Sequence, residues 1–206
     1  MTAMIHRIGE NPFQTAQPVD ATLRKSSAGM VSGTKVATRN GWRPVERLAP
    51  GDLVLTFDNG LQPLVHVGRY SLMANPLVHS VEDWPLFVPE GALGNLAPLI
   101  LTPGQVILIE SDLADRMFAD PFVAVPALCL DGIAGIERVR PDDRIAVTSL
   151  HFEEDQAVFG AGGAMFVCEG NGNLLSAGVA EAYPVIDGDL AREILSEGLM
   201  PAGAGD

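Results

Sequence analysis

The chain has 206 residues, of which 47% are hydrophobic and 19% charged, and its formal net charge at pH 7 is −13. This composition suffices for one buried core, and the negative charge argues against a nucleic-acid partner, whose phosphates would be repelled. No segment approaches the ~20 apolar residues of a membrane helix, and residues 1–28 lack the apolar centre of a cleavable signal peptide. We therefore expect a soluble protein without a membrane partner, cytoplasmic by default, with secretion by a leaderless route left open.

The predicted elements are mostly short β-strands, because brief apolar runs alternate with turns rich in the 22 glycines and 15 prolines. Residues 1–28 are polar, contain Pro12 and Pro18 and show no sustained period, so we expect a flexible leader there. Strands are predicted at 35–38, 44–48, 53–57, 62–70, 76–80, 85–89, 99–101, 105–110, 122–125, 144–152, 156–160 and 164–168. The sequence therefore predicts an all-β architecture.

Two glycine-containing turns are expected near the start of the strand region. Asn40-Gly41 tolerates positive φ at both central positions and predicts a tight hairpin turn after the first strand. Pro50-Gly51 predicts a type II turn, in which proline sets the first φ and glycine accepts the positive φ of the second. These turns set the spacing of the first three predicted strands.

Helical patterns are few. Residues 112–118 can form one or two helical turns, and 189–199 is the best helix in the chain, because Leu190, Ile194 and Leu195 share one face and Gly198 ends it. The expected organisation is therefore a leader (1–28), a β domain (29–170) and a C-terminal extension (171–206) that contains the helix.

Glycine, proline and acidic residues between Gly33 and Asp52 occur in an order typical of a known family. The segment reads G-T-K-V-A-T-R-N-G-W-R-P-V-E-R-L-A-P-G-D and resembles the opening block of Hint (hedgehog/intein) domains in their bacterial stand-alone form. The resemblance covers residues 27–170 and implies a β fold of two subdomains related by a pseudo-twofold axis. In that family a Cys, less often Ser, stands four residues before the first glycine of the block; here this position is Gly29.

Later segments extend the resemblance. Thr102-Pro103-x-Gln105 is similar to the family's second block, T/S-P-x-H, with Gln105 in place of the histidine. The stretch 147–159 resembles the strand pair that usually carries two histidines; His151 fills the first position, and the second falls near Gln156. The family-motif positions of this chain are therefore Gly29, Thr102, Gln105 and His151.

The resemblance implies a chemistry whose groups are incomplete in this chain. In Hint self-cleavage a Cys or Ser side chain attacks the preceding carbonyl, while the second-block histidine protonates the departing nitrogen and the threonine orients the bond. Gly29 has no side chain to attack with, and the amide of Gln105 cannot shuttle a proton near neutral pH. We therefore expect a Hint-like domain that has lost self-processing and acts as a binding or structural β module through an open cleft.

A second interpretation keeps the autoproteolysis and moves the nucleophile. Ser27 or Ser32 could replace the missing side chain, with His79 or His151 as the base. Against this, serines that follow Arg24-Lys25 are expected to be a solvated linker, and a shifted serine would sit several ångströms from the prepared position.

The remaining reactive residues predict no further site. Cys129 and Cys168 lie in apolar settings and are expected to be buried, inert thiols. No Cys or His pair has metal-ligand spacing and no phosphate-binding loop is present, so neither a metal nor a cofactor is expected. A protein or peptide is the partner that this interpretation favours. A short internal similarity joins Pro44-Val45-x-x-Leu48-x-x-Gly51 to Val125-Pro126-Ala127-x-x-Leu130-x-Gly132.

Overall fold

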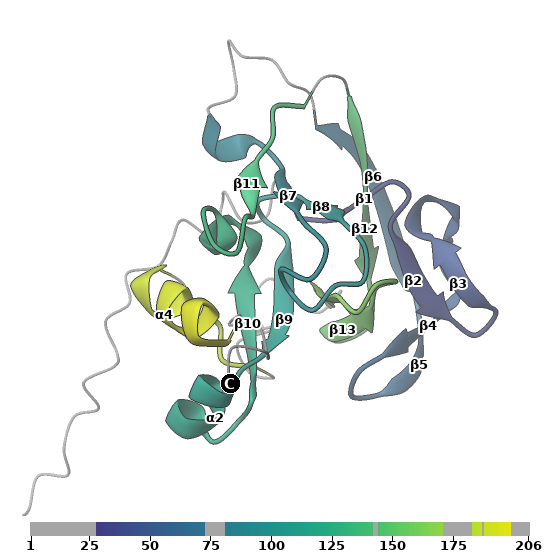
Figure 1. Cartoon of the computed structure of the whole chain (residues 1–206). Coiled ribbons are helices and arrows are strands. Elements are labelled where there is room, and N and C mark those ends of the chain that lie inside the picture. The colour runs from purple at the N-terminus through teal and green to yellow at the C-terminus, as the bar shows by residue number, and fades with distance from the viewer. Residues whose placement is uncertain (1–27, 73–80, 142–143, 171–182, 187, 199–206) are drawn as a thin grey trace, which may run out of the picture.

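The computed structural model of the chain describes residues 28–72, 81–141, 144–170, 183–186 and 188–198. In these residues antiparallel strands build two sheets, and two α-helices lie together at one side of the molecule (Figure 1). The predicted all-β class is confirmed. The predicted strand at 76–80, the leader up to residue 27 and most of the extension from 171 lie outside the described residues.

The smaller sheet has six described strands in the order β11-β7-β8-β1-β12-β6. Its strands are β1 (Met30–Val31), β6 (His66–Leu72), β7 (Leu86–Val88), β8 (Leu99–Leu101), β11 (Glu137–Arg138) and β12 (Ile145–His151). The two-residue β1 lies between β8 and β12, with Met30 opposite both Leu101 and Thr148. Sequence reasoning did not find β1, which is too short to show any period.

The larger sheet runs in the order β10-β9-β14-β13-β4-β2-β3, and β5 also pairs with β4. Its described strands are β2 (Lys35–Thr38), β3 (Gly41–Pro44), β4 (Leu53–Thr56), β5 (Gly60–Pro63), β9 (Val106–Glu110), β10 (Phe122–Pro126), β13 (Gln156–Phe159) and β14 (Met165–Cys168). The main hydrophobic cluster draws side chains from both sheets and both α-helices, for example Met30, Val36 and Ile194. The two sheets therefore share one core.

The two α-helices form where they were predicted. Helix α2 (Asp112–Phe118) begins after Ser111, whose side chain accepts a hydrogen bond from the backbone N–H of Ala114. Helix α4 (Gly188–Gly198) buries Ile194 and Leu195 against α2 and η3 (Ala127–Leu130). In the part of the chain that the structure describes, no helix has the length and apolar character needed to cross a membrane.

Three local predictions need correction. Residues 44–48 are not a strand: β3 ends at Pro44 and the chain turns into the 3₁₀ helix η1 (Val45–Arg47). The predicted strand 62–70 is interrupted at Leu64, because its N–H and C=O bond to Asp52 and Gly51 rather than to a neighbouring strand. In the first hairpin, Gly41 has φ +87° while neither central loop residue has positive φ, so the turn is not the mirror-image type that Asn-Gly predicted.

The short sequence similarity corresponds to a repeated structure. In both copies a strand ends at a proline with extended backbone, Pro44 or Pro126, and a 3₁₀ helix follows it, η1 or η3. The leucine at the end of each copy, Leu48 or Leu130, is fully buried. The same residues thus anchor the corresponding turn at two places in the chain. A further short 3₁₀ helix, η2 (Val81–Asp83), precedes β7.

Candidate functional site

The short strand β1 brings the first family-motif position next to the second block. Thr102 follows β8 directly, and its Oγ1 donates a 2.9 Å hydrogen bond to the carbonyl oxygen of Gly29. Gly29 is buried and the Thr102 side chain is fully buried. The backbone N–H of Gln105 closes the adjoining turn onto the carbonyl of Thr102 at 3.0 Å. The two family blocks therefore meet at Gly29 and the turn at 102–105.

The backbone at Gly29 has a conformation that only glycine adopts readily. Its φ is +149°, and a β-carbon at this position would lie 2.7 Å from Val147 Cγ1 and 3.1 Å from Thr148 O. Both the φ value and the spacing exclude an ordinary L side chain unless the neighbours move. The structure therefore has no space prepared for a nucleophile side chain at position 29.

The carbonyl that a nucleophile at position 29 would attack is itself held by a side chain. The hydroxyl of Tyr70, on β6, donates a 2.7 Å hydrogen bond to the carbonyl oxygen of Ala28. Burial raises the pKa of Tyr70 to about 12, so the phenol stays protonated and keeps donating at neutral pH. Sequence reasoning missed this residue, because 42 positions separate the two partners and nothing local marks Tyr70.

Gln105 is committed to structural hydrogen bonds. Its side chain is 3% exposed, and its Nε2 donates to the carbonyl oxygens of Val106 at 2.7 Å and Val167 at 3.0 Å. It therefore links β9 to β14 within the larger sheet. In this arrangement the amide N–H groups of Gln105 have two acceptors, and within the described residues no hydrogen bond joins its side chain to Gly29.

His151 lies at the end of β12, opposite His66 of β6. Its Nε2 lies 3.0 Å from Ser149 Oγ, and the two imidazole rings are 5.5 Å apart between centroids. Partial burial, and secondarily the neighbouring His66, lower the pKa of His151 despite an opposing effect of Glu169. In the described residues no hydrogen bond joins His151 to Gly29 or Thr102, so the fourth motif position stands apart from the first two.

The two cysteines are free and buried, as predicted. Burial raises the pKa of the Cys168 thiol strongly, and the nearby carboxylates of Asp155 and Glu169 raise it further, so the thiolate is disfavoured. Among the described residues no group of three or more His, Cys, Asp or Glu side chains is arranged to hold a metal ion.

Three of the family-motif positions, Gly29, Thr102 and Gln105, are buried, whereas His151 is half-buried. A groove of about 310 Å³ lies beyond the end of β1 and is bordered by Val31 to Lys35 and by the start of β8. Gly29, Thr102 and Gln105 are therefore enclosed by the fold rather than exposed to solvent.

Comparison with known proteins agrees with the motif analysis. A sequence model described as the Hint domain matches residues 28–166. The structure is similar to the solution structure of a bacterial intein-like domain from Clostridium thermocellum, with 14% identity, a TM-score of 0.49, and coverage of 68% of this chain and 99% of that chain. It is also similar to the AceL NrdHF class 3 split intein in a splice-inactive variant, with 15% identity, a TM-score of 0.45 and coverage of 68% and 95%. No curated protein matches the chain.

Proposed function

The chain belongs to the Hint domain family, and we propose that it does not process itself but serves as a β-rich binding or structural module. The observation that carries the proposal is the backbone at Gly29. Its φ of +149° and the 2.7 Å separation between a β-carbon there and Val147 Cγ1 leave no place for the side chain that would start an acyl shift. Without a nucleophile the first covalent step of self-cleavage has no starting group.

The groups around the missing nucleophile support the same conclusion. Thr102 and Tyr70 each donate a hydroxyl to one carbonyl of the 28–29 segment, which anchors this segment between the strands. Gln105 stands in place of a proton-shuttling histidine, and its side-chain amide donates hydrogen bonds to two backbone carbonyls. A set of groups that acts as a unit loses almost all of its catalysis when one member is absent, and here two are absent.

Autoproteolysis from a displaced serine is the competing function, and no feature of the described residues favours it. Ser32 follows β1, is exposed and donates its backbone N–H to the carbonyl of Ala146 at 2.9 Å. Ser27 lies outside the described residues. Neither observation brings a serine hydroxyl and a base to the 28–29 peptide bond.

The intact mass of the purified chain tests the proposal. We expect a single species of 21.8 kDa that is unchanged after overnight incubation with excess dithiothreitol or hydroxylamine. A fragment that begins between residues 26 and 32 would refute the proposal and favour the displaced serine. Ser32→Ala would then distinguish Ser32 from Ser27 as the nucleophile, since it would abolish that cleavage only if Ser32 were the attacking residue.

A further inference from the structure

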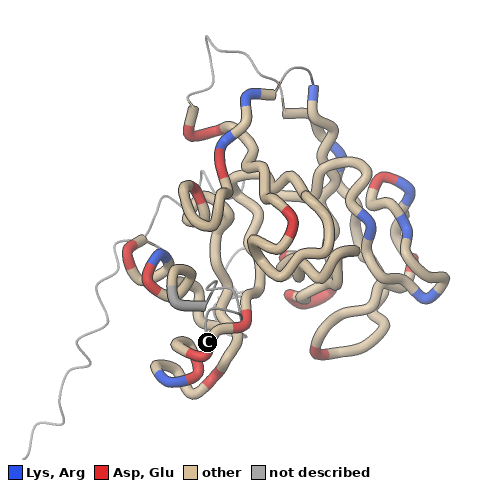
Figure 2. The backbone as a smooth tube through the Cα atoms, viewed as in Figure 1, with Lys and Arg blue, Asp and Glu red and all other residues tan. Residues whose placement is uncertain are grey.

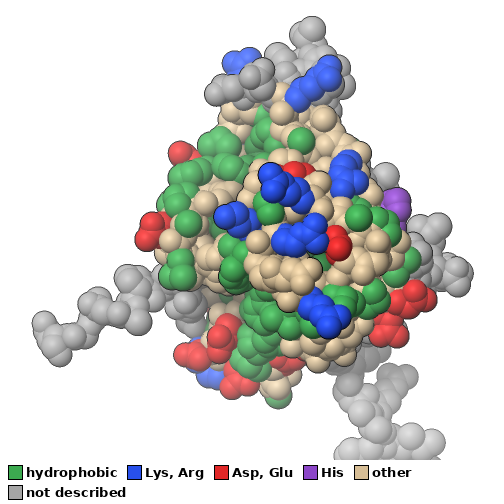
Figure 3. Space-filling view, turned by 90° about the vertical axis from the view of Figure 1, so that its right-hand side faces the viewer, with side chains coloured by type: hydrophobic (Ala, Val, Ile, Leu, Met, Phe, Trp, Pro, Cys, Tyr) green, Lys and Arg blue, Asp and Glu red, His purple; other side chains and the backbone are tan. Residues whose placement is uncertain are grey.

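Basic side chains are concentrated on one face of an otherwise acidic chain. Residues 28–72 carry five basic and three acidic side chains, whereas the whole chain has a net charge of −13. The five are carried by the β2–β3 hairpin, by η1 and by β6, on the right-hand side of Figure 1, and Figure 2 shows their positions along the backbone. Figure 3, which looks onto that side, shows basic side chains gathered in one area. We call this area the basic face and define it by Lys35, Arg39, Arg43, Arg47 and Arg69.

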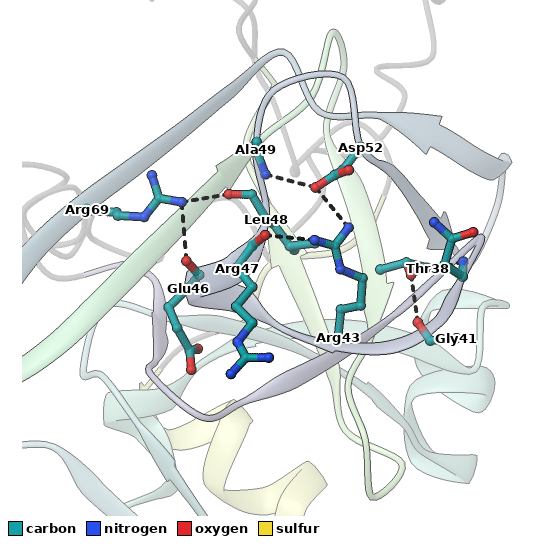
Figure 4. Close-up of polar contacts among 10 residues, drawn as sticks. Thr38, Gly41, Arg43, Glu46, Arg47, Leu48, Ala49, Asp52 and Arg69 are labelled. Carbon is teal, nitrogen blue, oxygen red and sulfur yellow. Dashed lines mark hydrogen bonds and ion pairs between the residues drawn. The ribbon is translucent and has the colours of Figure 1, made fainter.

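Two of these arginines are held in place by the backbone of η1 and the residue after it (Figure 4). Arg43 Nη2 donates to the carbonyl oxygen of Arg47 at 2.9 Å, and Arg43 Nη1 pairs with Asp52 at 3.1 Å. Arg69 reaches across from β6, and its Nη2 donates to the carbonyl oxygen of Leu48 at 2.6 Å. Their guanidinium groups are therefore fixed in position, and an approaching anion has less side-chain entropy to remove.

Part of the positive charge on this face is not used inside the protein. Within the described residues the side chains of Lys35, Arg39 and Arg47 form no hydrogen bond or ion pair. The carboxylates nearby are already engaged, since Glu46 accepts from the N–H of Gly33 and Asp52 pairs with Arg43. Glu46 stays charged and also interacts with Arg47, but residues 28–72 carry five basic and three acidic side chains, so their net charge is +2 and the basic face remains positive.

An apolar groove adjoins the basic face. The groove has a volume of about 310 Å³ and its lining includes Val31, Phe87, Leu99, Ile100, Phe166 and, at the basic end, Lys35. Two hydrogen bonds join its wall to η1, from the N–H of Val45 to the carbonyl of Thr34 at 2.9 Å and from the N–H of Gly33 to the carboxylate of Glu46 at 2.9 Å. Lys35 belongs to the basic face and also lines the groove, so the two adjoin at this residue.

We propose that the basic face binds an acidic segment of a partner protein and that one apolar side chain of this segment enters the adjoining groove. This inference rests on the proposed function as a binding module and specifies its ligand. A short acidic peptide interacts with the local positive charge only, because the Debye length is ~10 Å at 0.1 M salt. A long nucleic acid would extend onto the acidic remainder of the chain, and its phosphates would not fill an apolar groove.

Fluorescence anisotropy with a labelled peptide tests the inference on the full chain. The probe has a central leucine flanked on both sides by three glutamates, and its two controls replace either the glutamates by glutamines or the leucine by glycine. We expect saturable binding of the probe that weakens at least ~10-fold between 50 and 300 mM NaCl as the charges are screened. Both control peptides should bind more weakly than the probe.

Matched charge-reversal variants locate the site. Arg47→Glu should weaken probe binding at least ~10-fold, because an exposed cation of the basic face becomes an anion. Arg192→Glu makes the same charge change on the exposed side of α4, at the opposite side of the molecule in Figure 1, and should leave the affinity within ~2-fold. The Arg47 side chain makes no hydrogen bond within the described residues, so its replacement should leave the fold intact, which thermal melting checks.

Three outcomes would overturn the inference: no saturable binding of the probe, equal weakening by both charge reversals, or tighter binding of a single-stranded oligonucleotide than of the peptide. None of them alters the intact mass of the chain. The binding experiments therefore test the acidic ligand alone, and the mass measurement separately tests whether the chain processes itself.

Discussion

The close contact at Gly29 predicts a specific stability cost for any side chain at that position. In Gly29→Ala the added β-carbon meets Val147 Cγ1 at 2.7 Å and must also adopt φ +149°. Backbone strain of this kind costs about 1–3 kcal/mol, and overpacking of a buried site costs a further ~1–3 kcal/mol. We therefore expect Gly29→Ala to lower the free energy of unfolding by about 2–6 kcal/mol.

A comparison with Gly33→Ala separates these two contributions. Gly33 also has positive φ, +93°, but no atom lies within 4 Å of a β-carbon placed there. Gly33→Ala should therefore show the strain alone, about 1–3 kcal/mol. The difference between the two alanine variants measures the crowding at position 29, and urea denaturation of both variants at 25 °C supplies it.

A double-mutant cycle with Val147→Ala attributes the crowding to a named contact. Removing the valine methyls takes away the atom at 2.7 Å, so Gly29→Ala should cost ~1–3 kcal/mol less in the Val147→Ala background than in the parent chain. Equal costs in both backgrounds, or equal costs for Gly29→Ala and Gly33→Ala in the parent chain, would refute the argument that Gly29 is enforced by packing.

Three further predictions test the turn, the lost chemistry and the histidine pair. Gly51 has φ +90°, so Gly51→Val should lower the free energy of unfolding by about 1–3 kcal/mol in urea or thermal unfolding. The control Ala49→Ser changes an exposed residue of the same loop and should alter it by no more than ~0.5 kcal/mol. Equal melting temperatures for the two variants would contradict the type II turn. The double variant Gly29→Cys with Gln105→His should remain uncut in excess thiol unless Val147 is also replaced by a smaller residue. Mass spectrometry should place any cleavage at the peptide bond before the new cysteine. A cut elsewhere would show that the motif alignment is wrong. The pKa of His151 is lower in the folded than in the unfolded chain. The stability that the neutral imidazole contributes is therefore present above about pH 6.5 and is lost as the pH falls through the pKa of the folded chain. His151→Gln should flatten the decrease of the urea midpoint below about pH 6.5, and an unchanged slope would contradict the lowered pKa.

Much of the local structure could be predicted from the sequence because its causes are local. The period of apolar residues and the capping serine determine α2, and Pro50-Gly51 determines a turn whose glycine has φ +90°. The family assignment has the same origin, since short motifs of glycine, proline and acidic residues survive in order from Gly33 to Asp52.

The prediction of 44–48 as a strand was wrong because contacts with distant parts of the chain determine the structure of this segment. The residues of this segment have the composition of a strand, yet η1 forms because Val45 and Leu48 are drawn into the core while the Val45 N–H bonds to the Thr34 carbonyl. Burial and a distant hydrogen bond override local preference here. The similar segment at Pro126 also continues into a 3₁₀ helix, η3, so the same pattern gives the same turn at both places.

The candidate site itself depended on the tertiary structure. The sequence by itself determined that position 29 carries no nucleophile and that position 105 carries no histidine. Only the pairing of β1 with β8 and β12 brings Gly29 beside Thr102, 73 residues away, and places the Tyr70 hydroxyl on the Ala28 carbonyl. Nor does any pattern in the sequence give the φ of Gly29 or its distance to Val147, because both arise when strands far apart in the chain pack together, and packing is decided by the shape of the whole core.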